Sequence, residues 1–439
     1  MISRRAFVLS ASAALPLSLP LPAVASVVGV DLAPGAGDQT AAFQAGLDKA
    51  TAEKRPFVLA PGTYRIGAVR LPDGAQIVGT AGLTTLVAVD DGLALTGGPA
   101  KRIVLSGLGL DGRERESAGA QALLHLIGVE DLRLVDGTVG RGTASGVLLE
   151  RCGGRVERTT IAACAAFGLL ARDSRRLSIV DDTVTDCGDG GILVHRSSPG
   201  EDGTIVARNR VERIRARSGG TGQVGNGINT FRAGNVAILE NRVTDCAFSG
   251  IRVNGGGDIR IVGNEVTRSG ETALYVEFEF TGAVVANNVV HGGQMGISIV
   301  NYQVGGRLAV VSGNLVRDIT RPAQPPFAPP GVGYGITVEA DTAVTGNVIE
   351  GATQAGILVG WDGYLRDVTV TGNVVRGAPV GITVSVSEGA GAAVLTGNVI
   401  SGAAKGIVAN RHAQPVGGDL VGGAAGFPNL TVTGNRLEK

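Results

Sequence analysis

The feature that most constrains this chain is a short motif that returns about every 23 residues. A glycine or alanine followed by aliphatic residues recurs along most of the sequence, and from residue 227 to residue 296 it does so at constant steps of 23. The motif starts at residues 146, 168, 191, 227, 250, 273, 296, 335, 356, 381 and 406. Self-similarity of this period indicates a solenoid, in which each unit buries its apolar face against its neighbours.

A second marker, Asn or Asp before an aliphatic residue, follows the first by 14 residues in the regular repeats, at Asp182, Asn241, Asn264 and Asn287. The repeats are rich in β-branched residues and are closed by Gly and Asn turns, so each holds two or three short strands. We therefore predict an all-β parallel β-helix solenoid with coils of about 23 residues, whose asparagines stack at one corner and satisfy turn backbone groups.

The ends of the chain differ from the repeats. Residues 1–25 carry a twin arginine, Arg4 and Arg5, an apolar stretch and a small-residue cleavage motif, which predict a twin-arginine signal peptide. Residues 26–439 are expected to form a single β-helix domain, in which 26–80 supply an N-terminal cap and the first coils. Asp38 or Thr40 should cap an amphipathic helix through Leu47 and Ala50, which would cover the open end of the solenoid.

The capping stretch "GDQTAAFQAGLDKATAEKRPFVLAPGTYRI" and the coils behind it resemble proteins of the pectate-lyase-like, right-handed parallel β-helix superfamily. With the leader and the repeat, the whole chain also resembles the twin-arginine-translocated uncharacterized repeat proteins. These resemblances imply a right-handed coil and export of an already folded protein to the periplasm or the medium. They imply no activity.

Charge and cysteine content exclude several functions. The 39 basic and 39 acidic residues cancel, which gives no electrostatic case for nucleic acid or a membrane surface, and no segment after the leader is long and apolar enough to span a bilayer. Cys164, Cys187 and Cys246 each lie four residues before a repeat glycine, where we expect small buried hydrophobes. No zinc-ligand spacing links the four cysteines. We expect a monomer.

Two repeats are interrupted just ahead of a glycine strand. The larger inserts are "RARSGGTGQV" at 215–224 and the proline-rich "TRPAQPPFAPPGVG" at 320–333. Both inserts leave the same corner of the coil, so they should stand as two walls on either side of four coils. Four coil steps separate the coil at residue 227 from the coil at residue 335, which is about 19 Å at a strand spacing of about 4.8 Å. This predicts a groove with room for several sugar rings.

Alternation along the strands predicts which side chains line that groove. Polar and aromatic residues gather at the outward positions between the inserts: His195, Asn229, Phe231, Arg252, Asn254, Tyr275, Glu277, Glu279 and Ser298. Eliminative cleavage of an acidic polysaccharide needs a cation, a base and an acid. Arg252 could supply the cation, Glu277 or His195 the base and Tyr275 the acid. His195 lies three coils before Glu277, so the two could not serve one bond. Asn229, Phe231, Asn254, Glu279 and Ser298 would bind substrate.

Three alternatives stay open. An inverting glycoside hydrolase could use Glu277 and Glu279, which are two residues apart and are expected to lie on one face. A non-catalytic module could bind a cell-envelope glycan on the same surface, and Arg252 and Glu277 could be a surface ion pair of little weight. The sequence indicates no certain cofactor; Ca²⁺ would suit an acidic-sugar lyase, and Asp181, Asp182 and Asp186 lie close in sequence, although repeat turns explain these acids equally well. An acidic polysaccharide or another envelope glycan is the expected partner.

Overall fold

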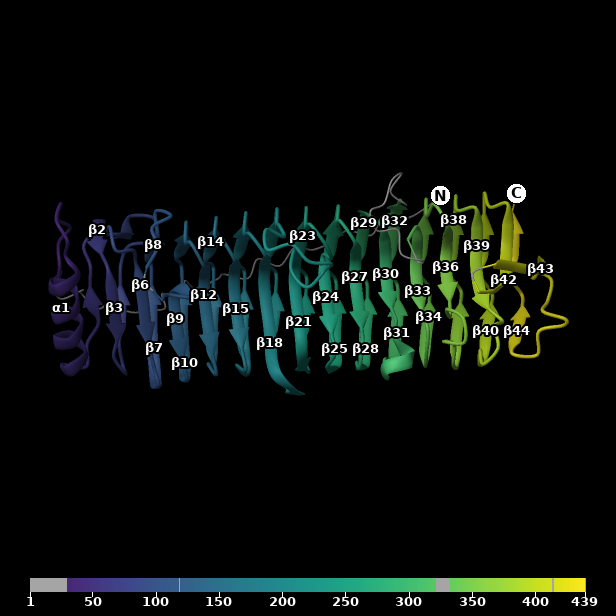
Figure 1. Ribbon diagram of the computed structural model, residues 1–439, viewed down its shortest axis with the longest axis horizontal. Helices are drawn as coiled ribbons and strands as arrows, with labels where there is room; N and C mark the ends of the chain where they lie inside the picture. The colour runs from purple at the N-terminus through teal and green to yellow at the C-terminus, as the bar shows by residue number, and fades with distance from the viewer. Residues whose placement is uncertain (1–29, 118, 321–331, 413, 439) are drawn as a thin grey trace, which may run out of the picture.

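The structure, a computed structural model, describes residues 30–117, 119–320, 332–412 and 414–438. Within these residues the chain winds into a long parallel β-solenoid whose strands form three 15-stranded sheets (Figure 1). The predicted all-β parallel β-helix is confirmed. The predicted leader and residues 321–331 of the second insert lie outside the described residues. No described helix is long and apolar enough to cross a membrane.

Each coil contributes one strand to each sheet, in a fixed order. The first sheet runs from β1 (Phe57–Val58) to β44 (Leu430–Thr433), the second from β2 (Gly62–Ile66) to β45 (Arg436–Glu438), and the third begins at β3 (Ala68–Leu71). The third-sheet strands of the central coils are β15 (Phe167–Arg172), β18 (Gly190–Glu201), β21 (Asn226–Gly234), β24 (Ile251–Asn254), β27 (Thr272–Glu277), β30 (Met295–Ile299) and β33 (Tyr334–Val338). The repeat glycine or alanine is the second residue of each of these strands, except in β24, where Gly250 directly precedes the strand.

The following first- and second-sheet strands of the central and adjoining coils flank two corners. In the first sheet they are β16 (Leu177–Val180), β19 (Ile205–Ala207), β22 (Ala237–Leu239), β25 (Gly257–Val262), β28 (Thr281–Ala286), β31 (Arg307–Ser312), β34 (Thr342–Thr345) and β37 (Val368–Thr371). In the second sheet they are β20 (Arg210–Glu212), β23 (Arg242–Thr244), β26 (Glu265–Thr267), β29 (Val289–Gly293), β32 (Leu315–Ile319) and β35 (Val348–Glu350). One apolar core runs through the solenoid between the three sheets.

Close packing inside the coil explains the repeat glycine. A Cβ atom at Gly250 would lie 2.3 Å from Val266 Cγ1 and 2.9 Å from the carbonyl oxygen of Ala273. Only a very small residue therefore fits beside the β-branched side chain that arrives from the second sheet. Cys164, Cys187 and Cys246 fill the same interior corner as buried free thiols, as the sequence predicts.

An asparagine ladder stabilises the corner between the first and second sheets. At each rung the side-chain oxygen accepts the backbone N–H of the preceding rung, as Asn264 does from Asn241 at 2.9 Å, and the side-chain nitrogen donates to a carbonyl, as Asn264 does to Ile238 at 2.9 Å. The rungs are Asn209, Asn241, Asn264, Asn288, Asn314, Asn347, Asn373, Asn398 and Asn435. Buried turn amides thereby find partners.

One rung was predicted at the wrong residue. The ladder uses Asn288 and not Asn287, which has a φ of 56° outside the ladder. The reason is one extra residue between the third and first sheets of this coil, because Asn254 pairs with Glu277 whereas Gly257 pairs with Thr281. The register of the coil is therefore shifted by one position after Glu277.

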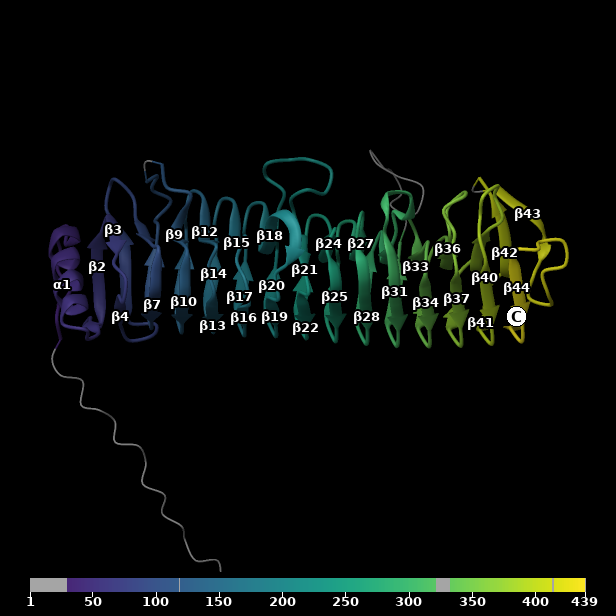
Figure 2. The ribbon, with the colours of Figure 1, turned by 90° about the horizontal axis from the view of Figure 1, so that it is seen from below.

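Both ends of the solenoid carry additional structure (Figures 1 and 2). Helix α1 (Thr40–Ala52) buries Phe43, Leu47 and Ala50 against the first coil, and the ring centroids of Phe43 and Phe57 lie 5.1 Å apart. The Asp38 carboxylate accepts the N–H of Thr40 at 2.8 Å at the start of this helix. At the other end β42 (Lys405–Arg411) pairs antiparallel with β43 (Gln414–Asp419), the one antiparallel strand pair among the described residues.

Candidate functional site

Two outward columns of side chains cross the third sheet at its centre. Strand pairing places Asn229, Arg252, Tyr275 and Ser298 in one column, one residue per coil. His195, Phe231, Asn254 and Glu277 lie in the neighbouring column, which continues on the earlier coils to Arg172 and Glu150. The alternation predicted from the sequence places these residues in the columns in which the structure has them.

Arg252 and Glu277 meet across neighbouring coils. Glu277 Oε1 lies 2.6 Å from Arg252 Nε and 2.5 Å from Nη2, and it also accepts the side-chain N–H of Asn254 at 3.1 Å. The two charged side chains are only 11% and 3% exposed. This is a buried, charge-assisted pair and not the solvated surface pair that is worth little.

Tyr275 completes a cluster with Arg252, Asn254 and Glu277, called here the third-sheet cluster. The guanidinium carbon of Arg252 lies 5.5 Å from the centroid of the Tyr275 ring, within the range of a cation–π contact. Burial, followed by the nearby charges of Glu277 and Glu271, raises the pKa of Tyr275 above its usual value. The phenol therefore keeps its proton at neutral pH, so in any proton transfer it starts as the donor.

The carboxyl group of Glu277 is suited to the opposite role. Burial raises the pKa of Glu277 above its ordinary value, while the charge and hydrogen bond of Arg252 lower it. A carboxylate whose proton affinity is raised accepts a proton more readily near neutral pH. The third-sheet cluster thus combines a fixed cation, a proton acceptor and a proton donor.

The first insert covers this cluster instead of standing as a wall beside it. In the segment 215–224, the carbonyl oxygen of Gly222 accepts a hydrogen bond from Arg252 Nη1 and another from Asn226 Nδ2. Ser218 fastens the segment to Asp189, whose Oδ1 accepts its N–H at 2.8 Å and whose Oδ2 accepts its hydroxyl at 2.5 Å. The expected open floor is therefore closed above Arg252.

The structure does not bring His195 to the cluster. Its ring packs edge-on against Phe231, with centroids 5.8 Å apart, and its Nε2 atom is buried without a hydrogen-bond partner. Burial, together with the charge of Arg172, lowers the pKa of His195 to about 4. His195 is therefore a neutral ring that lies three coils from Glu277 in the same column.

The expected carboxyl pair of Glu277 and Glu279 does not form. Strand β27 ends at Glu277, and Phe278 has a left-handed φ of 60°, so period-two alternation stops there. Glu279 is exposed at the corner between the third and first sheets, where it lines a hollow with Glu201 and Asp258. The prediction that both carboxyls share one face is wrong, because the extra residue of this coil lies between Glu277 and Thr281.

The acids considered for Ca²⁺ do not converge. Asp181 pairs with Arg208 at 2.8 Å and Asp186 pairs with Arg213 at 2.8 Å. Asp182 is buried on the ladder, where its Oδ1 accepts the N–H of Thr159 at 2.7 Å. The described part of the chain holds no group of three or more His, Cys, Asp or Glu side chains able to bind a metal ion. These residues do not fit a calcium site.

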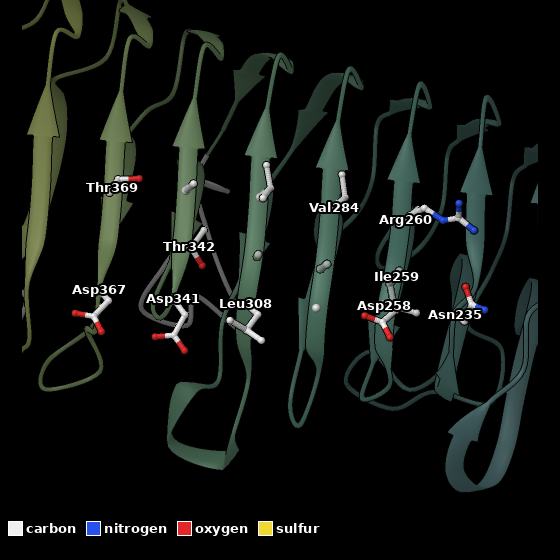
Figure 3. Close-up of a pocket in the computed structure, with 15 residues that line it drawn as sticks. Asn235, Asp258, Ile259, Arg260, Val284, Leu308, Asp341, Thr342, Asp367 and Thr369 are labelled. Carbon is white, nitrogen blue, oxygen red and sulfur yellow. The ribbon is translucent and has the colours of Figure 1, made fainter.

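A second surface feature escaped the sequence analysis. The first sheet carries a hollow of about 700 Å³ whose floor includes Val284 and Val310 and whose rim includes Asp258, Asp341 and Asp367 (Figure 3). The hollow lies outside the outward positions of the glycine strands. The exposed valines of β28 and β31 follow the same alternation and could have revealed it.

Comparison with known proteins supports the fold. The family model described as "Right handed beta helix region" matches residues 145–316 and 223–388, which together span more than half of the 439 residues. Among solved structures, pre-mature bacteriophage phi29 gene product 12 is similar to this chain, with a TM-score of 0.53 and 15% identity. The match covers 88% of this chain and only 56% of the phage protein. An N-terminal fragment of that protein gives a TM-score of 0.53 and 14% identity, covering 91% of this chain and 72% of the fragment.

The A-module of the mannuronan C-5 epimerase AlgE6 from Azotobacter vinelandii is 18% identical to the chain, with a TM-score of 0.37, and the match covers 92% of this chain and 96% of the module. No curated protein sequence matches the chain significantly. At these identities the likeness to solved structures concerns the fold alone.

Proposed function

The chain belongs to the right-handed β-helix region family, and we propose that it binds an acidic polysaccharide along its third sheet and moves a proton at a uronate residue, as an eliminative lyase or an epimerase does. The observation that carries this proposal is the contact of Arg252, Tyr275 and Glu277 on two neighbouring coils. A cation, an acceptor and a donor are the groups that this chemistry requires.

Each group has a definite role in the proposal. The Arg252 guanidinium neutralises the sugar carboxylate, which makes the adjacent C–H bond more acidic. Glu277 accepts that proton. In elimination, the bond to the glycosidic oxygen then breaks as the carbon–carbon double bond forms, and Tyr275 protonates the leaving oxygen. In epimerisation, no bond to oxygen breaks, and Tyr275 instead donates a proton to the opposite face of the same carbon. Substrate reaches Arg252 only when the segment 215–224 moves away from it.

The test is incubation of the full chain with polygalacturonate, alginate and glycosaminoglycans. Unsaturated product, followed by ultraviolet absorbance, reports a lyase, and solvent deuterium incorporated at the sugar ring without cleavage reports an epimerase. Tyr275→Phe and Arg252→Lys should reduce either signal by about 100-fold or more. Tyr302→Phe, a tyrosine that packs on Arg366 away from the cluster, is the matched control. Reducing ends without unsaturation would instead indicate a hydrolase.

A second candidate is a non-catalytic glycan-binding solenoid. It is favoured by the closed state of the cluster, because Arg252 and Glu277 satisfy one another and Gly222 lies over the guanidinium. This function predicts glycan binding, measured by calorimetry, with no unsaturated product and no isotope exchange. Loss of binding in Tyr275→Phe without any turnover in the unaltered chain would select it.

We also propose that the twin-arginine leader exports the folded protein to the periplasm or the medium. Residues 1–35 fused to a fluorescent reporter should direct the folded reporter across the inner membrane. Replacing Arg4 and Arg5 by lysine should retain it in the cytoplasm. Export that persists after the double replacement would contradict this route.

A further inference from the structure

The outer face of the first sheet, on the opposite side of a corner from the third-sheet cluster, has a hollow with an aliphatic floor. Strand pairing aligns Arg260, Val284, Val310, Ala343 and Thr369 in one outward column. Val284 is 40% exposed and Val310 is 43% exposed. Exposed aliphatic side chains in register on a concave surface indicate a contact surface for a ligand.

One rim of the hollow is acidic. Asp258, Asp341 and Asp367 lie in a row at the N-terminal ends of the strands of this sheet (Figure 3). Asp341 is paired with Arg366 at 2.6 Å, whereas neither Asp258 nor Asp367 has a cationic partner among the described residues. At the Asn235 and Asp258 end, the hollow continues into a second one lined by Glu201 and Glu279. The five acids named here outnumber the nearby cations, which are Arg260 on the floor and Arg366 and Arg307 near Asp341, so the face is acidic on balance.

Leu308 is an independent sign that this rim meets a ligand. It occupies the left-handed turn position that is otherwise held here by Asn235, Asp258, Gly282, Asp341 and Asp367. Asn, Asp and Gly tolerate positive φ, whereas leucine is strained there, with a φ of 66°. Leu308 is also 48% exposed, so core packing does not offset the strain. Strain without a packing benefit points to a functional role.

We propose that this first-sheet face binds a cationic glycan, a chain of amine-bearing sugars lying along the solenoid axis. The unpaired carboxylates pair with the sugar ammonium groups, and Leu308 with the two valines packs against the apolar faces of the rings. Four coil steps separate Asp258 from Asp367, about 19 Å at the usual strand spacing, which accommodates several rings. The proposal goes beyond the function of the third sheet, because both the face and the ligand charge differ.

The fold favours a sugar over a basic peptide as the occupant. Every strand that forms this floor is paired on both sides within the sheet, so its backbone N–H and C=O groups are not free to bind an extended peptide. Recognition must come from side chains. Carboxylate, amide and aliphatic side chains suit hydroxyl groups, amines and ring C–H groups.

Calorimetry on the full chain tests the proposal with glucosamine oligomers as the probe. We expect binding that weakens with salt and falls about tenfold or more in the double variant Asp258→Asn/Asp367→Asn. Asp131→Asn, an acid of the same sheet outside the hollow, should have no effect. Fully N-acetylated oligomers should bind at least about tenfold more weakly, since they lack the ammonium groups.

Leu308→Asn separates a structural role from a binding role. Asparagine relieves the strain of the left-handed turn, so the variant should melt at a higher temperature and yet bind glucosamine oligomers more weakly. The proposal is overturned if glucosamine oligomers do not bind, if acetylated oligomers bind equally well, or if Leu308→Asn leaves affinity unchanged. Equal binding of oligolysine with the same sensitivity to the variants would also overturn it, in favour of a peptide-binding face. None of these outcomes depends on activity at the third sheet.

Discussion

Arg252 and Glu277, on neighbouring coils of the third sheet, form an ion pair from which solvent is almost excluded, with Nη2 and Oε1 2.5 Å apart. The pair holds together two coils and, through the Arg252 bond to Gly222, the segment 215–224. A buried charge that loses its partner is costly, because its desolvation is no longer compensated.

Removal of Arg252 alone should therefore destabilise the protein strongly. Arg252→Met leaves the Glu277 carboxylate buried, and we expect a loss of about 3–5 kcal/mol in the free energy of unfolding at pH 7. The double variant Arg252→Met/Glu277→Gln should recover most of this loss. Urea denaturation of the four members of the cycle measures the coupling, and additive losses would show that the two groups do not interact.

Asp182 should make stability depend on pH. Burial raises the pKa of Asp182 from 3.8 to about 7, and Oδ2, which occupies the place of the amide nitrogen on the other rungs, is buried without a partner. Between about pH 4 and pH 7 the folded state thus holds a proton on Asp182 that the unfolded state releases. The contribution of Asp182 to the free energy of unfolding is therefore complete below about pH 4 and is lost as the pH rises to about 7.

Asp182→Asn should restore a full ladder rung and remove this dependence. We expect the variant to be more stable than the unaltered chain by a few kcal/mol at pH 8, and by much less at pH 4. Urea denaturation at the two pH values measures the difference. A stabilisation that is equal at both would rule out a protonated Asp182.

Two adjacent asparagines should respond very differently to substitution. Asn288→Ala removes a buried side chain that donates hydrogen bonds to Asn314 and Ile261 and accepts one from the backbone N–H of Asn264, and should cost about 2–4 kcal/mol. Asn287→Gly keeps the left-handed turn and should change stability by less than about 1 kcal/mol. The melting temperatures of the two variants, measured by thermal unfolding, test this prediction. A larger loss of stability in Asn287→Gly than in Asn288→Ala would place the ladder at Asn287.

His195 should stay neutral through the physiological range. Its pKa of about 4 means that folding requires the uncharged ring, so its contribution to stability is complete above about pH 6.5 and is lost as the pH falls towards 4. NMR titration of the ring protons should show no transition between pH 5 and pH 8. A midpoint near 6.5 would show that the ring is open to solvent.

The central columns of the third sheet could be predicted because the repeat is uninterrupted there. From residue 227 to residue 275 each coil has the same length, so the position after the glycine fixes which side chains face outward. Arg252 and Tyr275 therefore fall in one column by counting alone. The same counting fails after Glu277, because the alternating sequence "EFEFT" looks like a continued strand whereas Phe278 adopts a left-handed turn.

Two other features leave little trace in a single sequence. The contact that closes the cluster is made by the backbone carbonyl of Gly222, and any residue has a carbonyl. Asp341 and Asp367 look like ordinary turn residues, and only the three-dimensional register shows that they line one rim with Leu308. Periodicity thus predicts which side chains face outward, but not which loop lies over them.

The two end structures give the solenoid a fixed length. Helix α1 shields the first coil, while Val421 and Phe427 pack against the last part of the core beside β43. A chain cut before Lys405 that also lacks helix α1 would present unpaired strand edges at both ends, and their spacing matches that of any other copy. Such a truncated protein should polymerise end to end into fibres. Helix α1 and the C-terminal segment that contains β43 therefore prevent an end-to-end assembly that strand pairing between copies would otherwise allow.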